Sequence, residues 1–121
     1  MKTYKDLDAY KISMEFVTEI YQLTRSFPKE EIFGLTNQMR RAAVSIPSNI
    51  AEGSSRNSKK EYIRFLYIAL GSNSELNTQL TIARNLKLIT EEQHRQHIDR
   101  SDSIGKMING IIRYLKSSLP K

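Results

Sequence analysis

Apolar side chains recur along four segments of the 121-residue chain with the alternating three- and four-residue spacing of an amphipathic helix. The segments cover about residues 3–26, 31–52, 58–87 and 90–118. Ser58 with Glu61, and Thr90 with Gln93, have the spacing of a capping box at the starts of the last two. Because short connections between helices favour antiparallel neighbours, the pattern predicts an all-α, antiparallel, up-down-up-down four-helix bundle. Residues 1–121 are expected to form a single domain.

The second segment contains Pro47, which should interrupt a helix because proline lacks an amide hydrogen and crowds the preceding turn. The apolar seam nevertheless crosses Pro47 in phase, through Leu35, Met39, Ala42, Ile46, Ile50 and Gly53. Two separate helices would have little reason to keep that phase, so one helix kinked at Pro47 is expected. At its end, Gly53 can supply a left-handed C-cap.

The first segment is apolar over an unusually wide arc, roughly 200° when its residues are placed 100° apart. One apolar set is Leu7, Tyr10, Met14, Val17 and Tyr21, and the other is Ile12, Phe16, Ile20, Leu23 and Phe27. A surface helix needs only about 100° to face one core. We therefore expect a homo-oligomer, with an interface formed by Phe16, Ile20, Leu23 and Phe27. The alternative is an interior helix or a broad seam within one chain.

Composition limits the cellular setting of the protein. The chain has no cysteine, which excludes disulfides and thiolate chemistry and suits a reducing compartment. No apolar run has the length of a membrane span, and charged residues interrupt the N-terminal stretch. A cytoplasmic location without membrane association is the expectation.

The net charge of +6 is unevenly distributed. Residues 1–32 hold five basic and six acidic side chains, whereas residues 33–87 hold eight basic and three acidic ones. A basic surface there would bind phosphate backbones with little sequence preference, and Tyr67 is the main aromatic residue left outside the seams. The candidate nucleic-acid-binding residues are Arg40, Arg41, Arg56, Lys59, Lys60 and Arg64. The alternative is an ordinary solvated face of a mildly basic protein.

Polar residues interrupt the seams of the second and third helices. Asn49 and Glu52 could face Ser72 and Asn73, forming a hydrogen-bonded layer that fixes the register of the bundle. If Glu52 belongs to such a layer, Glu52→Gln should damage folding or assembly. A catalytic role would make Glu52 a general base. No histidine, nucleophile or metal-ligand set lies near Glu52 in the sequence to support that role.

Metal and catalytic patterns are incomplete. Glu91 with His94 matches one of the two Glu-x-x-His motifs of ferritin-type bundles, and the chain has no second match. A two-histidine site of His94 and His97 stays open. Helical ribonucleases that use an Arg followed by His need a closer pair than Arg84 and His94, and no glycine-rich phosphate loop occurs. No catalytic residue, metal or cofactor is therefore expected, and the protein is predicted not to be an enzyme.

Two motifs carry a family resemblance. They are Ser45-Ile46-Pro47-Ser48-Asn49-Ile50-Ala51-Glu52-Gly53 and the spaced set Tyr62, Phe65, Leu66, Ile68, Ala69, Gly71, Ser72, Glu75 and Leu76. This pattern resembles the family of four-helix-bundle proteins encoded in 23S ribosomal RNA intervening sequences, which is similar to the accessory variability determinant of diversity-generating retroelements. The resemblance implies a homopentamer that pairs with a reverse transcriptase and binds nucleic acid through a basic surface.

The expected function is accordingly that of a non-enzymatic, homo-oligomeric adaptor with RNA or DNA as its candidate partner. Two alternatives stay open: a scaffold that binds only protein, and a metal-binding bundle.

Overall fold

The computed structural model describes residues 7–119, which contain four α-helices and one short 3-10 helix joined by turns. The elements are α1 (Asp8–Thr24), η2 (Lys29–Glu31), α2 (Leu35–Ser54), α3 (Lys59–Asn85) and α4 (Glu91–Ser117). The described residues contain no strand, and the predicted all-α four-helix bundle is confirmed. The first four residues of the predicted first helix, 3–6, lie outside the described part.

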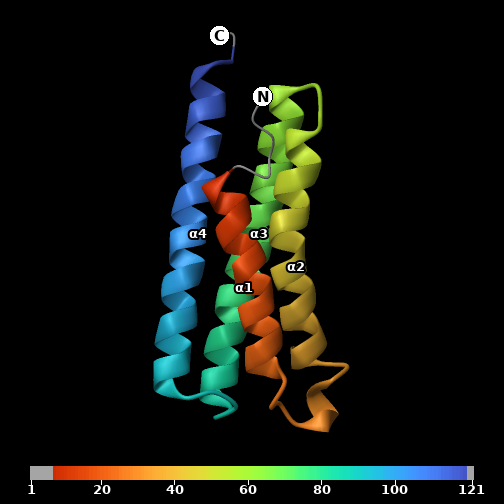
Figure 1. Ribbon diagram of the computed structural model, residues 1–121, viewed down its shortest axis with the longest axis vertical. Coiled ribbons are helices and arrows are strands. Elements are labelled where there is room, and N and C mark those ends of the chain that lie inside the picture. The colour runs from red at the N-terminus through yellow and green to blue at the C-terminus, as the bar shows by residue number, and fades with distance from the viewer. Residues whose placement is uncertain (1–6, 120–121) are drawn as a thin grey trace.

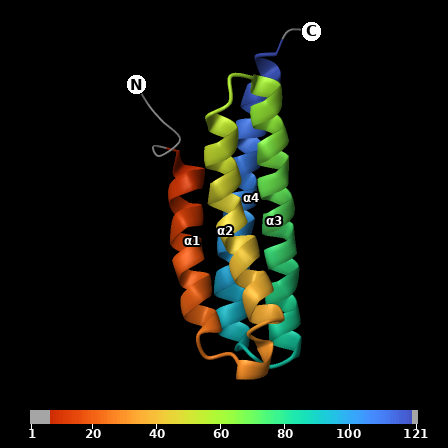
Figure 2. The same cartoon turned by 90° about the vertical axis from the view of Figure 1, so that its right-hand side faces the viewer.

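The helices form a closed set of neighbours in which α1 and α3 each contact α2 and α4 (Figures 1 and 2). In Figure 1 the chain runs down α1, up α2, down α3 and up α4. The α1 helix has 17 residues, whereas α3 and α4 have 27 each. At the end of the bundle that holds the α2–α3 turn, the other three helices therefore extend past α1 (Figure 1).

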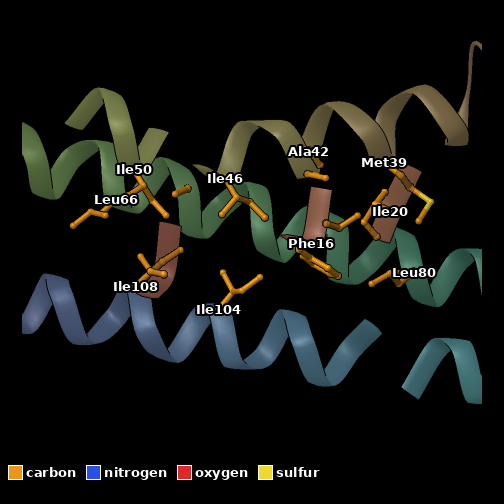
Figure 3. Close-up of a cluster of buried hydrophobic side chains, with 14 of the residues drawn as sticks. Phe16, Ile20, Met39, Ala42, Ile46, Ile50, Leu66, Leu80, Ile104 and Ile108 are labelled. Atoms are coloured by element: carbon orange, nitrogen blue, oxygen red, sulfur yellow. The ribbon is translucent and has the colours of Figure 1, made fainter. Parts of the chain in front are cut away.

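The core is continuous along the bundle and receives side chains from all four helices (Figure 3). Phe16 and Ile20 of α1 are 0% exposed, and Leu23 and Phe27 are 8% and 9% exposed. The prediction that these four residues form an interface between subunits is therefore wrong, because their own chain already covers them. For these four residues the alternative prediction, a broad apolar seam within one chain, is the correct one. The other apolar set of α1 still includes exposed side chains.

The α2 helix is continuous from Leu35 to Ser54 with Pro47 inside it, so the possibility of two short helices is excluded. A bend at Pro47 stays a prediction. The helix begins four residues later than the sequence suggested, because Ile32–Gly34 form a turn and the Glu31 Oε1 accepts from the Leu35 amide at 3.2 Å.

Gly53 does not form a left-handed cap, because no described glycine has positive φ. Its role is close packing of α2 on α3: a Cβ at this position would lie 2.7 Å from the Phe65 Cβ and 3.2 Å from the Tyr62 carbonyl oxygen. The glycine thus determines how closely the two helices approach at the turn that joins them.

Both predicted capping residues act at the starts of their helices. The Ser58 hydroxyl accepts from the Glu61 amide at 3.2 Å, and Thr90 with Gln93 forms a complete capping box. In each case the side chain satisfies an amide that has no partner within the helix. These caps fix where α3 and α4 begin.

Candidate nucleic-acid interface

The positive charge of the described chain is concentrated at one end of the bundle. Residues 7–51 contain five basic and five acidic side chains, and residues 68–112 again contain five of each. Residues 52–67 and 113–119, which we call the basic end, contain six basic side chains and two acidic ones. The six are Arg56, Lys59, Lys60, Arg64, Arg113 and Lys116. All the net charge of residues 7–119 therefore lies where the α2–α3 turn meets the C-terminal end of α4 (Figure 1).

Two arginines of the basic end are held against the ring of Phe65. The Cζ of Arg56 lies 5.1 Å from the ring centroid and that of Arg64 lies 4.6 Å from it, both within cation–π range. Each arginine also pairs with a carboxylate three or four residues earlier in the chain, Arg56 with Glu52 at 3.0 Å and Arg64 with Glu61 at 3.2 Å. The hydrogen bond from Arg64 lowers the pKa of the Glu61 carboxyl, and the same contact raises the pKa of Arg64. Both acidic residues of the basic end are thus neutralised locally.

The lysines of the basic end join α3 to α4. The Lys59 Nζ donates to the Ser118 Oγ at 2.9 Å, and the Lys116 Nζ donates to the Tyr67 Oη at 2.7 Å. Lys60 is exposed and has no polar partner among the described residues. Arg113 and Lys116 were not among the predicted binding residues, although antiparallel pairing of the last two helices predicts that the end of one lies beside the start of the other.

Arg40 and Arg41 do not belong to this cluster. Arg41 precedes Arg56 by fifteen residues, about 22 Å along a helix. The Arg40 Nε donates to the Thr24 Oγ1 at 2.9 Å, and its guanidinium lies 4.6 Å from the Tyr21 ring centroid. Arg40 therefore connects α2 to α1. Four of the six predicted residues gather at the basic end, and two lie elsewhere.

The predicted polar layer is in fact two separate clusters. On the α2–α3 side, Ser72 donates to the Ser45 Oγ at 2.8 Å, and the Asn49 Nδ2 donates to the same oxygen at 2.9 Å. Asn73 instead faces α4. Glu52 belongs to neither cluster, because its side chain is 53% exposed and pairs with Arg56. The prediction that Glu52 faces Ser72 and Asn73 is wrong.

Asn73 and Ser101 form a reciprocal pair between α3 and α4. The Asn73 Nδ2 donates to the Ser101 carbonyl at 2.9 Å, and the Ser101 Oγ donates to the Asn73 Oδ1 at 3.0 Å. Both side chains are buried, so the pair satisfies polar groups that solvent does not reach. Ser101 was missed, although it is in phase with the apolar stripe of Ile104 and Ile108.

The two histidines contact different groups. No group of three or more potential metal-ligating side chains (His, Cys, Asp or Glu) occurs within residues 7–119. The His97 Nδ1 lies 2.7 Å from the Gln93 carbonyl, and the His94 Nε2 lies 3.1 Å from the Thr81 Oγ1. The fold does bring Arg84 to His94, with 3.5 Å between the Arg84 Nη1 and the His94 Nδ1. A guanidinium only donates hydrogen bonds, so the His94 Nδ1 is the acceptor in this contact.

The fold and this site define a class: small helical bundles with one strongly basic end. The chain belongs to the family of 23S rRNA-intervening sequence proteins, whose family model matches residues 5–110. It is also similar to a crystal structure from Bacteroides thetaiotaomicron, described as a protein with unknown function from the S23 ribosomal protein family. That similarity has a TM-score of 0.81 at 29% identity and covers 87% of this chain and 95% of the other. Neither description names an enzyme.

A search of curated proteins finds no match. Within the described residues, none of the helices is both long enough and apolar enough to cross a membrane.

Proposed function

We propose that this protein is a non-enzymatic, homo-oligomeric adaptor that binds RNA or DNA through its basic end. The observation that carries the proposal is the confinement of the net charge to residues 52–67 and 113–119. A localised positive surface binds the phosphate backbone through counterion release, whereas evenly mixed charges do not. The family is named after the intervening sequence of 23S rRNA, which makes RNA a reasonable first partner to test.

The salt dependence of binding tests this proposal. Purified protein is titrated into labelled RNA or DNA of unrelated sequence, and the observed association constant is measured by fluorescence anisotropy over a range of salt concentrations. If the basic end contacts four phosphates of duplex DNA, the logarithm of the constant should fall with the logarithm of salt concentration with a slope of about −3.6. Absence of binding at low salt would favour the scaffold that binds only protein.

A pair of charge variants locates the surface. Lys60→Gln removes an exposed charge of the basic end without breaking an ion pair, and it should reduce the slope by about one unit. Lys11→Gln removes an exposed lysine of α1 and serves as the matched control. Equal effects of the two substitutions would show that binding is not localised at the basic end.

The homo-oligomer is proposed on a corrected surface, the outer side of α1 and α2. Met14 and Tyr21 of α1 are 45% and 40% exposed, and Val44 of α2 is 40% exposed. Met14 and Tyr21 are the exposed members of the other apolar set of α1, and Val44 adds an exposed apolar side chain from α2. Met14→Glu should reduce the molar mass measured by light scattering toward that of the 14.0 kDa chain. A wild-type protein that is already monomeric at low micromolar concentration would refute the oligomer.

Two finer proposals rest on resemblance rather than on this geometry, and a third, a cytoplasmic location, rests on composition, because a chain without cysteine suits a reducing compartment. The similarity to the accessory variability determinant of diversity-generating retroelements suggests a homopentamer and a reverse transcriptase as a protein partner. Light scattering tests the stoichiometry. Co-purification with a reverse transcriptase encoded near the gene tests the partner.

A further inference from the structure

An exposed aromatic ring lies within the basic end. Tyr67 is 47% exposed and follows Lys60 and Arg64 at helical spacing, so the three side chains share one face of α3. The Lys116 Nζ of α4 lies 5.1 Å from the centroid of the Tyr67 ring and donates to its hydroxyl. The ring is thus held in place by one cation, and two further basic side chains precede it on the same face of α3. Such an arrangement of aromatic and basic side chains is typical of proteins that stack unpaired bases while holding the phosphates between them.

A polar groove between α3 and α4 begins close to this ring. Leu70, which lines the groove, follows Tyr67 by three residues, and Asn109, which also lines it, precedes Lys116 by seven. The groove therefore opens within two helical turns, about 10 Å, of the Tyr67–Lys116 pair. Its volume is about 560 Å³, within the range of pockets that hold molecules of nucleotide size.

The lining of the groove suits the edges of bases better than phosphates. It includes the side chains of Ser74, Asn77, Thr78, Asp102, Lys106 and Asn109. The Asn77 Nδ2 already donates to the Ser101 Oγ at 3.2 Å and to the Asp102 Oδ1 at 3.4 Å, which leaves further acceptor capacity on the Asp102 carboxylate. The carboxylate of Asp102 would repel a phosphate, whereas it accepts hydrogen bonds from base amino groups. The Asn109 side chain has no hydrogen-bond partner among the described residues, so its amide is available to a ligand.

We propose that the basic end and the α3–α4 groove form one binding track for single-stranded nucleic acid. In this track a base stacks on Tyr67, the cations Lys60, Arg64 and Lys116 contact the backbone, and neighbouring bases enter the groove. A duplex keeps the faces of its bases stacked on one another and cannot offer them to Tyr67. This inference rests on the proposed function and adds that the preferred partner is unpaired.

The test compares four labelled probes at one fixed salt concentration: single-stranded RNA, single-stranded DNA of the same sequence, and the duplex of each. The full-length protein should bind the single strands more tightly than the duplexes. A preference for RNA would show that the groove also contacts the 2′-hydroxyl, and equal binding of RNA and DNA would assign the preference to stacking. Either result supports the track, provided that the single strands bind more tightly than the duplexes.

Three substitutions separate stacking from charge. Tyr67→Leu should weaken single-strand binding by about tenfold, the loss expected for one base–aromatic stack, with little change in salt slope. Tyr67→Phe keeps the ring and should keep the affinity. Phe33→Leu removes an aromatic ring that is 93% exposed in the turn before α2, outside the basic end and the groove, and it should have no effect.

A fourth substitution tests the groove itself. A Cβ on Gly105 would meet only the Asn73 Nδ2, at an ordinary contact distance of 3.4 Å, so Gly105→Met should fold and fill the groove. Thermal melting confirms folding, and single-strand affinity should fall.

The results of these experiments distinguish failure of the single-strand track from failure of nucleic-acid binding itself. If duplexes bind as tightly as single strands and Tyr67→Leu binds like the wild type, the track is refuted while nucleic-acid binding stands. If Gly105→Met folds and binds normally, the groove is refuted as part of the track. If no polynucleotide binds, the proposed function fails as well.

Discussion

The close approach of α2 and α3 at Gly53 yields the sharpest prediction, because the same substitution at a second glycine should have the opposite sign. Gly53→Ala adds one methyl group at a position where its carbon would lie 2.7 Å from the Phe65 Cβ and 3.0 Å from the Tyr62 Cδ1. It would also lie 3.2 Å from the Tyr62 carbonyl oxygen, which belongs to the backbone of α3. Neither the Phe65 Cβ nor this backbone oxygen can rotate away, so the two helices must separate.

The expected magnitude follows from two opposing terms. Overpacking of a tight core contact costs about 1–3 kcal/mol. Alanine is favoured over glycine by up to about 1 kcal/mol inside a helix, and by less near a helix end such as this one. We therefore expect Gly53→Ala to lower the free energy of unfolding by about 1–2 kcal/mol. For a chain of this size the melting temperature should fall by about 4 °C for each kcal/mol.

Gly71→Ala is the matched control. Gly71 lies inside α3, and a Cβ there would meet nothing within 4 Å, so only the helix propensity changes. Its free energy of unfolding should rise by about 0.5–1 kcal/mol. Urea titration of both variants, followed by circular dichroism at fixed protein concentration, measures the two changes. A Gly53→Ala protein as stable as Gly71→Ala would refute the argument that close packing requires glycine at this turn.

Three further predictions concern side-chain contacts. Asn73→Ala should lower the free energy of unfolding by about 2 kcal/mol in urea titrations, because Ser101 loses its buried partner. Glu52→Gln should be damaging if Glu52 lies in a buried polar layer, but because its carboxylate is exposed the substitution should change stability by less than about 0.5 kcal/mol in the same assay. In NMR titrations the pKa of Glu61 should lie below 4.5 and return toward 4.5 in Arg64→Gln. Because this pKa is lowered in the fold, the contribution of Glu61 to stability is present above pH 4.5 and is lost as the pH falls through the lowered value.

The candidate site was only partly predictable. Arg56, Lys59, Lys60 and Arg64 lie within nine residues of one another across a turn, so a sequence argument could group them. Their neighbours Arg113 and Lys116 come from a helix far along the chain. Arg40 looked equivalent to Arg56 in the sequence, but its guanidinium binds Thr24 and Tyr21 of α1. The partner of an arginine such as Arg40 depends on which helix packs against its own helix. The local sequence carries little information about that packing.

The sequence by itself determined the number of helices, the continuity of α2 through Pro47 and the caps at Ser58 and Thr90. These features follow from spacing and from contacts three or four residues apart, which a chain carries in its local order. Only the tertiary structure decided which of the two apolar sets of α1 is covered. It also decided that Gly53 is a packing residue and that Asn73 faces Ser101 rather than Glu52. Each of these depends on the rotation of one helix against another, because a turn of about 100° exchanges buried for exposed positions without changing the helical pattern.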